Sequence, residues 1–238
     1  MVFYSLSDYG GNIKHIEHRG KERQIKIKRY LQKYKLYKSE RKKAMNDRLK
    51  KQMDFIMEAD KMKSITRQTY IADGSRKEND AEHSWSLALM CMLMAEHANS
   101  EINLLRTMQM VLVHDLVEID AGDTYAYDTE GNVTKREREI AAAQRIFHIL
   151  PQDQAELLWG LWNEFEEGET AEAKFANTLD KVQPLTLNHQ TGGISWKEHD
   201  IKAEQVMKRN KRTPEGSKVL WEYCQKIIDE NIENGNLK

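Results

Sequence analysis

The apolar run Val111–Val117 contains two adjacent ionisable residues, His114 and Asp115. Ionisable groups in a segment this apolar cost free energy on burial unless they have partners. Coordination of one metal ion would satisfy both side chains at once. The doublet therefore limits the possible folds to those in which other parts of the chain bring matching polar groups to it.

The composition predicts an all-α protein. The chain has only three prolines in 238 residues and is rich in Ala, Leu, Met, Glu and Lys, which are strong helix formers. Runs of β-branched residues are scarce. We expect a compact helical bundle, with helices near residues 46–63, 80–98, 101–119, 134–150, 152–167, 170–190, 198–211 and 214–233.

The charge distribution predicts two regions. Residues 1–44 hold 13 Lys and Arg against four Asp and Glu, whereas residues 45–238 hold 24 against 34. We predict a basic, mobile N-terminal extension over residues 1–44 and one domain over residues 45–238. In the extension, basic residues interleaved with tyrosines over residues 21–43 fit a nucleic-acid contact and also a solvated helix. Met45 is an alternative start of the natural chain.

Targeting features predict a cytoplasmic protein. No apolar run is long enough to span a bilayer, and the polar, basic N-terminus has no apolar core of a signal peptide. The two cysteines, Cys91 and Cys224, are too few for a disulfide framework. We therefore expect reduced cysteines and no contact with a membrane.

The residues around the doublet predict a metal centre. Glu118 follows His114 by four residues and Asp115 by three, so a continuous helix would place all three side chains close together. His83 opens an apolar helical segment upstream, and Asp180 lies at the edge of another downstream. A set of two histidines and two aspartates suits Mn²⁺, Co²⁺, Fe²⁺ or Zn²⁺ better than Ca²⁺.

His83, His114-Asp115 and Asp180 resemble the H…HD…D motif of the HD superfamily of metal-dependent phosphohydrolases. Their surroundings are similar to the 5′-deoxynucleotidase branch, which includes the HD-domain-containing protein 2 group. The segments that carry this similarity are Arg76–Ser84, Val113–Glu118, Ala121–Asp123, Glu172–Ala176 and Leu179–Lys181.

The resemblance implies an HD-domain bundle that forms a homodimer and binds one divalent metal ion. The implied ligands are His83, His114, Asp115 and Asp180. It also implies hydrolysis of the phosphomonoester of a (deoxy)nucleoside 5′-monophosphate by a metal-activated water.

Further site roles are also implied by the resemblance. Glu118 matches the acidic residue beside the attacking water, and Asp123 matches a catalytic acidic position that contacts the sugar. Arg67 matches an arginine that holds the phosphate, and Arg76 is a second candidate for that contact. Gln68 stands where many members have a tryptophan linked to deoxyribose preference, so this position predicts no sugar preference here.

Two alternatives stay open at this point. The chain could be an HD phosphodiesterase or nucleotide pyrophosphohydrolase that acts on a larger nucleotide. It could instead be a non-catalytic module that binds nucleic acid through residues 21–43. Lys181, which follows the last candidate ligand, could reach the phosphate, but we interpret it as a solvated lysine.

Overall fold

The computed structural model of the chain describes residues 7–128 and 133–238, with side chains from residue 28 onward. The chain divides into two compact units, residues 1–50 and 51–238. The first helix, α1 (Ser7–Ala59), contributes residues to both units. The predicted boundary at residue 44 falls inside this helix. The predicted mobility of residues 1–44 stays a prediction, and it includes residues 1–6, which lie outside the described residues.

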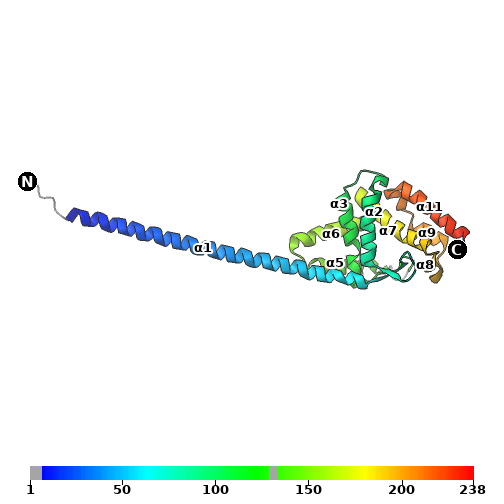
Figure 1. Cartoon of the computed structure of the whole chain (residues 1–238), viewed down its shortest axis with the longest axis horizontal. Helices are drawn as coiled ribbons and strands as arrows, with labels where there is room; N and C mark the ends of the chain where they lie inside the picture. Colours follow the sequence, from blue (N-terminus) through cyan, green and yellow to red (C-terminus); the bar gives the residue numbers. More distant parts are fainter. Residues whose placement is uncertain (1–6, 129–132) are drawn as a thin grey trace, which may run out of the picture. The chain divides into compact units, whose positions relative to one another are not determined.

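The second unit is almost entirely helical, which confirms the all-α prediction (Figure 1). Its elements after α1 are η1 (Asp60–Ser64), β1 (Thr66–Tyr70), β2 (Lys77–Asn79), α2 (Asp80–Met94), η2 (Ala95–His97), α3 (Leu104–Val113), η3 (His114–Val117), α4 (Glu118–Ala121), α5 (Lys135–Phe147), α6 (Gln152–Glu167), α7 (Ala171–Gln190), α8 (Ile194–Glu198), α9 (Ala203–Arg209), α10 (Thr213–Gly216) and α11 (Lys218–Glu233).

A short antiparallel hairpin is the only β-sheet in the described residues. Strand β1 pairs with β2, with Thr66 opposite Asn79 and Tyr70 opposite Lys77. Gly74 turns the chain between the strands with a φ of 71°, a conformation that glycine adopts without strain. The hairpin was not foreseen, because strands this short carry little periodic signal.

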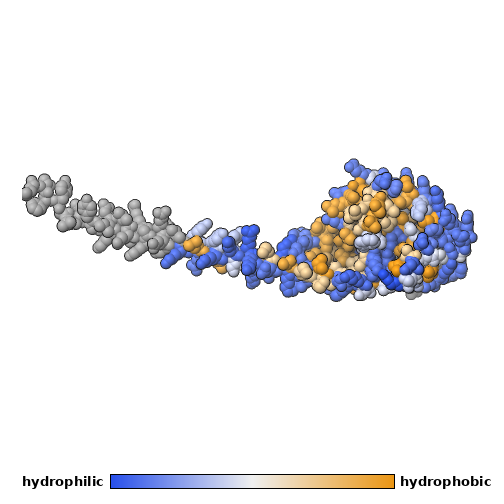
Figure 2. All heavy atoms as spheres, viewed as in Figure 1, coloured by the Kyte–Doolittle hydropathy of each residue, from blue (hydrophilic) through white to orange (hydrophobic). Residues whose placement is uncertain are grey.

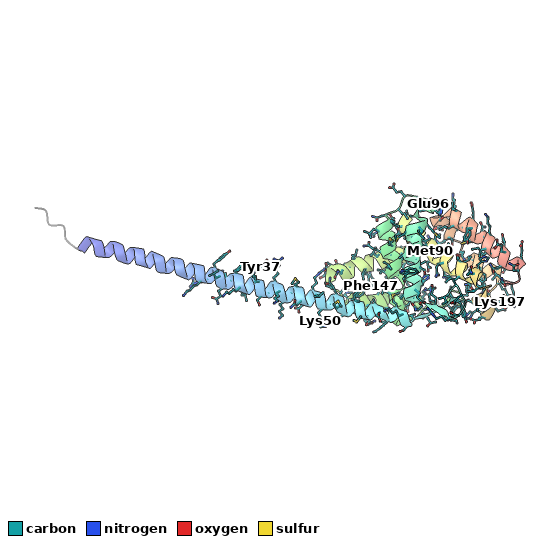
Figure 3. The ribbon with its side chains drawn as sticks, in the orientation of Figure 1. Tyr37, Lys50, Met90, Glu96, Phe147 and Lys197 are labelled. Carbon is teal, nitrogen blue, oxygen red and sulfur yellow. The ribbon has the colours of Figure 1, made fainter. Side chains whose placement is uncertain are left out.

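Helix α7 is the central helix of the domain and contacts α2, α3, α6, α10 and α11. Phe175, Leu179 and Val182 of α7 are buried in the larger of two apolar clusters. The second cluster lies around α5 and α6 and contains Phe147, which Figure 3 labels, and Trp162. The predicted ligands on η3 and α7 lie on elements that pack into these two clusters.

The segment predicted as one helix over residues 101–119 is three helical pieces. Helix α3 ends at Val113, the doublet lies in the 3-10 segment η3, and Glu118 begins α4. A 3-10 turn is wound more tightly than an α-turn, so the side chains leave the axis at different angles. The prediction of a continuous helix through His114 and Asp115 is therefore wrong.

Among the residues that the structure describes, no helix has both the length and the apolar character that a bilayer crossing requires.

Candidate metal centre and adjoining cavity

The first imidazole of the site comes from the start of α2. Asn79 caps this helix, and its side chain and that of Glu82 bond to each other's backbone N–H groups at 3.0 and 3.2 Å. This capping box fixes the first turn of α2 and aims His83 into the core. His83 is fully buried. Its Nδ1 lies 3.0 Å from Oε1 of Gln183, and its Nε2 lies 3.1 Å from Oδ1 of Asp180.

The second imidazole comes from η3. His114 Nδ1 donates to the backbone carbonyl of Val111 at 2.9 Å, and the ring packs on Phe165 with centroids 4.7 Å apart. Its Nε2 faces two carboxylate oxygens, at 3.1 Å from Asp115 and 3.7 Å from Asp180. The four predicted ligands therefore meet at one point.

The donor set fits a divalent cation. In both histidines Nδ1–H donates a hydrogen bond to a carbonyl oxygen, which leaves the Nε2 lone pair facing carboxylate oxygens. Acceptors that face acceptors repel unless a cation or a proton lies between them. His114 Nε2 is buried and has no hydrogen-bond partner in the described residues. Ligand atoms of His83, His114 and Asp115 all lie within 4.8 Å of one another.

Electrostatics at this point favours positive charge. Burial alone would lower the pKa of His114, but the carboxylates of Asp115 and Asp180 outweigh it and raise that pKa to about 10. Burial likewise raises the pKa of Asp180, and contacts with His114 and His83 reverse this and hold it well below its usual range. The same interactions would favour a bound metal ion.

Arg67 of β1 lies beside the ligands, where it contacts carboxylates. Its Nη1 lies 2.7 Å from Asp115 and 3.2 Å from Asp80, and its Nε lies 3.8 Å from Glu78. Arg67 is buried and also lines the cavity next to the metal centre. It thus positions Asp115, while its predicted phosphate contact stays a prediction.

Glu118 and Asp123 line the same cavity. Glu118 begins α4. Its pKa is raised well above the usual range, mainly by burial and further by repulsion from Asp115 and Asp80. Gly122, with a φ of 75°, then turns the chain so that Asp123 follows in the cavity wall. Burial, reinforced by Asp115, raises the pKa of Asp123. The structure therefore brings both predicted catalytic carboxylates to the metal centre.

Of the remaining predicted substrate contacts, Gln68 lines the cavity and Arg76 does not. Gln68 Oε1 accepts a hydrogen bond from Lys77 at 2.6 Å and lies 3.2 Å from His199 Nε2. Arg76 is exposed at the surface, where it makes a double ion pair with Glu82 at 2.6 and 2.8 Å. Arg76 therefore lies outside the cavity in which the phosphate would bind.

Several cavity residues were missed or misjudged from the sequence. Lys181 is half-buried in the cavity wall, so its interpretation as a solvated lysine is wrong. Burial, together with nearby Arg209, lowers the pKa of Lys181. Arg209 of α9 lines the same cavity. No sequence signal connects α9 with the doublet.

The missed residues behind the ligands had a partial signal. Gln183 follows Asp180 by three residues on α7, a spacing that places both on one face. Its Nε2 donates to Glu78 Oε1 at 2.7 Å, which fixes its Oε1 toward His83. Gln183 therefore orients the imidazole of His83.

The model of the HD domain family matches residues 59–221, which contain the whole cluster. The chain belongs to the HD domain family. The resemblance to this family noted in the sequence is thereby confirmed. The role of the four converging residues as metal ligands stays a prediction.

Relatives and solved structures agree with this assignment. Human "5'-deoxynucleotidase HDDC2" is 30% identical over 150 residues, which is 60% of this chain and 72% of the human protein. Fission-yeast "5'-deoxynucleotidase hdd1" is 28% identical over 133 residues, 52% of this chain and 64% of that protein. A "Predicted metal-dependent phosphohydrolase" from Magnetospirillum magnetotacticum is 47% identical, with a TM-score of 0.77 over 80% of this chain and 96% of its own.

A more distant HD-domain phosphohydrolase from Listeria innocua shares the fold. It is 17% identical, with a TM-score of 0.52 over 76% of this chain and 85% of its own.

Proposed function

We propose that this chain is a metal-dependent phosphohydrolase that releases phosphate from (deoxy)nucleoside 5′-monophosphates. The observation that carries this proposal is the convergence of two imidazoles and two carboxylates beside a cavity lined by two further carboxylates and by the cations Lys181 and Arg209. The solved structure at 47% identity supports the reaction type. The names of the human and yeast relatives support the nucleotide substrate.

His83, His114, Asp115 and Asp180 would hold one divalent ion, with Mn²⁺, Co²⁺, Fe²⁺ and Zn²⁺ as candidates for its identity. When bound, such an ion polarises a phosphoryl oxygen and lowers the pKa of water. The four residues are mostly or fully buried, and electrostatic interactions are strong where water is excluded.

The protein's own residues supply proton transfer and phosphate binding. Glu118, whose pKa is raised, is suited to accept a proton from water at the phosphorus. Asp123, which lines the cavity, would contact the sugar. Lys181 and Arg209, which line the cavity, would bind the anionic phosphate, while Arg67 holds Asp115 in place.

The alternatives differ in the substrate that the cavity accepts. A phosphodiesterase or a nucleotide pyrophosphohydrolase would use the same ligands on a larger nucleotide. A cytoplasmic location and a homodimer belong to the proposal as further expectations. A nucleic-acid contact through residues 21–43 is a separate prediction, and the side chains of residues 21–27 lie outside the described ones.

The test is phosphate release from a panel of 5′-dNMPs and 5′-NMPs with Mn²⁺ or Co²⁺. Cyclic nucleotides and nucleoside triphosphates are run in parallel, and their nucleotide products are followed by chromatography. We expect turnover of monophosphates. We also expect Asp115→Ala to lose bound metal and activity together, and Glu118→Gln to keep the metal but slow kcat by about 10²–10⁴-fold.

Asp120→Asn is the matched control, because Asp120 lies on the same short helix as Glu118 but pairs with Arg145 at the surface. It should leave kcat unchanged. Absence of turnover for every monophosphate would refute the proposal, and turnover of only the larger nucleotides would favour the alternatives.

A further inference from the structure

The cavity beside the metal centre is lined by different chemistry away from the ligands. Carboxylates line it next to the metal centre, whereas aromatic and aliphatic side chains also contribute to its wall: Tyr125, Tyr127, Leu185, Trp196 and Val206. Helix α8, which carries Trp196, contacts α7. Figure 2 shows a small group of apolar atoms among hydrophilic ones where Figure 1 places α8. Aromatic walls of this kind suit a planar base better than a phosphate group.

Helix α7 runs along the cavity from the metal centre. Asp180, Pro184 and Asn188 all line the cavity and recur at intervals of four residues, so they lie on one side of the helix. At the helical rise of 1.5 Å per residue, Asn188 lies roughly 12 Å along the axis from Asp180. A nucleotide whose phosphate lies at the metal centre therefore has its base, the group farthest from the phosphate, toward Asn188.

Asn188 carries a buried acceptor without a partner. The residue is 6% exposed, and its Nδ2 donates to the backbone carbonyl of Pro184 at 3.0 Å. This bond fixes the orientation of the amide, because the reversed amide would place two oxygens against each other. The Oδ1 atom is buried and has no hydrogen-bond partner within residues 7–128 and 133–238. Buried acceptors are seldom left unpaired, because each costs free energy.

A second amide in the cavity wall shows the contrast. Asn210 is 3% exposed, and its Nδ2 donates to the backbone carbonyl of Val206 at 2.9 Å. Its Oδ1 accepts a hydrogen bond from the Thr213 hydroxyl at 3.3 Å. Both ends of the Asn210 amide are therefore used by the protein, whereas the oxygen of Asn188 is left for a ligand.

We infer that Asn188 Oδ1 accepts a hydrogen bond from an N–H group of the nucleobase. The inference rests on the proposed function and adds to it a residue that recognises the base. Adenine, guanine, cytosine, thymine and uracil each carry an N–H group, whereas the sugar and the phosphate carry none. One acceptor beside aromatic walls thus requires a base with an N–H group and does not by itself choose among the common bases.

The first experiment compares two substrates of the metal-loaded full chain. One is dAMP, and the other is the 5′-monophosphate of 2′-deoxyribosylpurine, which lacks the 6-amino group and with it every N–H of the base. We expect kcat/KM to be roughly 10–100-fold lower for the second, because the acceptor then stays buried without a partner. Equal kcat/KM values for the two substrates would overturn the inference.

Asn188→Leu tests the residue itself, because leucine has a similar size and no acceptor. We expect kcat/KM for dAMP to fall toward that of the purine analogue, so that their ratio approaches one. A merely structural role of Asn188 would lower both values equally and keep the ratio, which would contradict the inference. Asn163→Leu is the control, because Asn163 lies on α6 outside the cavity. It should keep the ratio of the wild type.

Binding of the nucleosides separates this inference from the proposed function, because it needs no turnover. Calorimetry on the wild type should show deoxyadenosine binding more tightly than 2′-deoxyribosylpurine, by a similar factor, and Asn188→Leu should remove the difference. If this difference is seen but no monophosphate is hydrolysed, the proposed function is refuted and the recognition of the base stands. If monophosphates are hydrolysed but the two nucleosides bind equally, the role of Asn188 is refuted and the proposed function stands.

Discussion

At the scale of single residues, the site depends on how each imidazole is held. His83 and His114 both use Nδ1 for a protein oxygen and present Nε2 to the carboxylates. For His83 the oxygen belongs to the side chain of Gln183, which donates a hydrogen bond to Glu78. For His114 it belongs to the backbone of Val111. Residues that orient ligands in this way affect metal affinity without touching the metal.

Gln183→Leu should therefore weaken metal binding while leaving the fold intact. The substitution removes the acceptor of His83 Nδ1, so we expect the Kd for Mn²⁺ to rise about 10–100-fold. Isothermal titration calorimetry measures this directly. Gln190→Leu, at the exposed end of the same helix, is the control and should bind as the wild type does. An unchanged Kd in Gln183→Leu would contradict the role assigned to this residue.

At the scale of the elements, breaks in regular helix shape the site. The 3-10 turn η3, which contains the doublet, separates α3 from α4. All four of its residues, His114–Val117, are buried. On α7, Pro184 has no N–H to donate to the carbonyl of Asp180, four residues earlier. Each break occurs at or next to a ligand.

A substitution at the contact between α10 and α7 tests how tightly the central helix is packed. A methyl group added at Gly216 would overlap the Lys174 carbonyl and the Thr178 hydroxyl of α7. We expect Gly216→Ala to lower the free energy of unfolding by about 1–3 kcal/mol. That corresponds to a fall in Tm of roughly 2–10 °C by differential scanning calorimetry.

Gly160→Ala is the matched comparison, and we expect it to raise the free energy of unfolding. Gly160 lies within α6, and an added methyl group meets no atom within 4 Å. Replacing a helical glycine by alanine there should stabilise the protein by about 1 kcal/mol. Equal effects of the two substitutions would show that α10 does not pack on α7 as described.

At the scale of the whole molecule, the metal centre links segments far apart in the chain. Its ligands come from α2, η3 and α7, so a bound ion ties these elements together. The same convergence leaves carboxylates and imidazoles facing one another. Metal binding should therefore stabilise the whole domain.

Metal removal should lower the thermal stability of the domain. At a metal concentration about 100 times Kd the stabilisation is about 2.7 kcal/mol, so chelation should lower Tm by roughly 5–10 °C. Thermal melts with and without EDTA measure this shift. His114→Ala should abolish the shift, whereas His148→Ala, at an exposed histidine of the second unit, should retain it. A shift that survives in His114→Ala would place the metal elsewhere.

The sequence by itself determined the helical class, the four converging residues and the pair Glu118 and Asp123. Helix propensity and the cost of burying His114 and Asp115 are local properties, which can be recognised along the chain. Glu118 followed from its short spacing to the doublet, and Asp123 followed from the resemblance to the family.

Only the tertiary structure decided which cations reach the cavity and what holds the ligands. It placed Arg209 beside Lys181 and turned Arg67 toward Asp115. It also removed Arg76 to the surface, where it pairs with Glu82. These outcomes depend on contacts between α9, α7 and the β1–β2 hairpin, and distances between separate elements are set by packing, which no local pattern encodes.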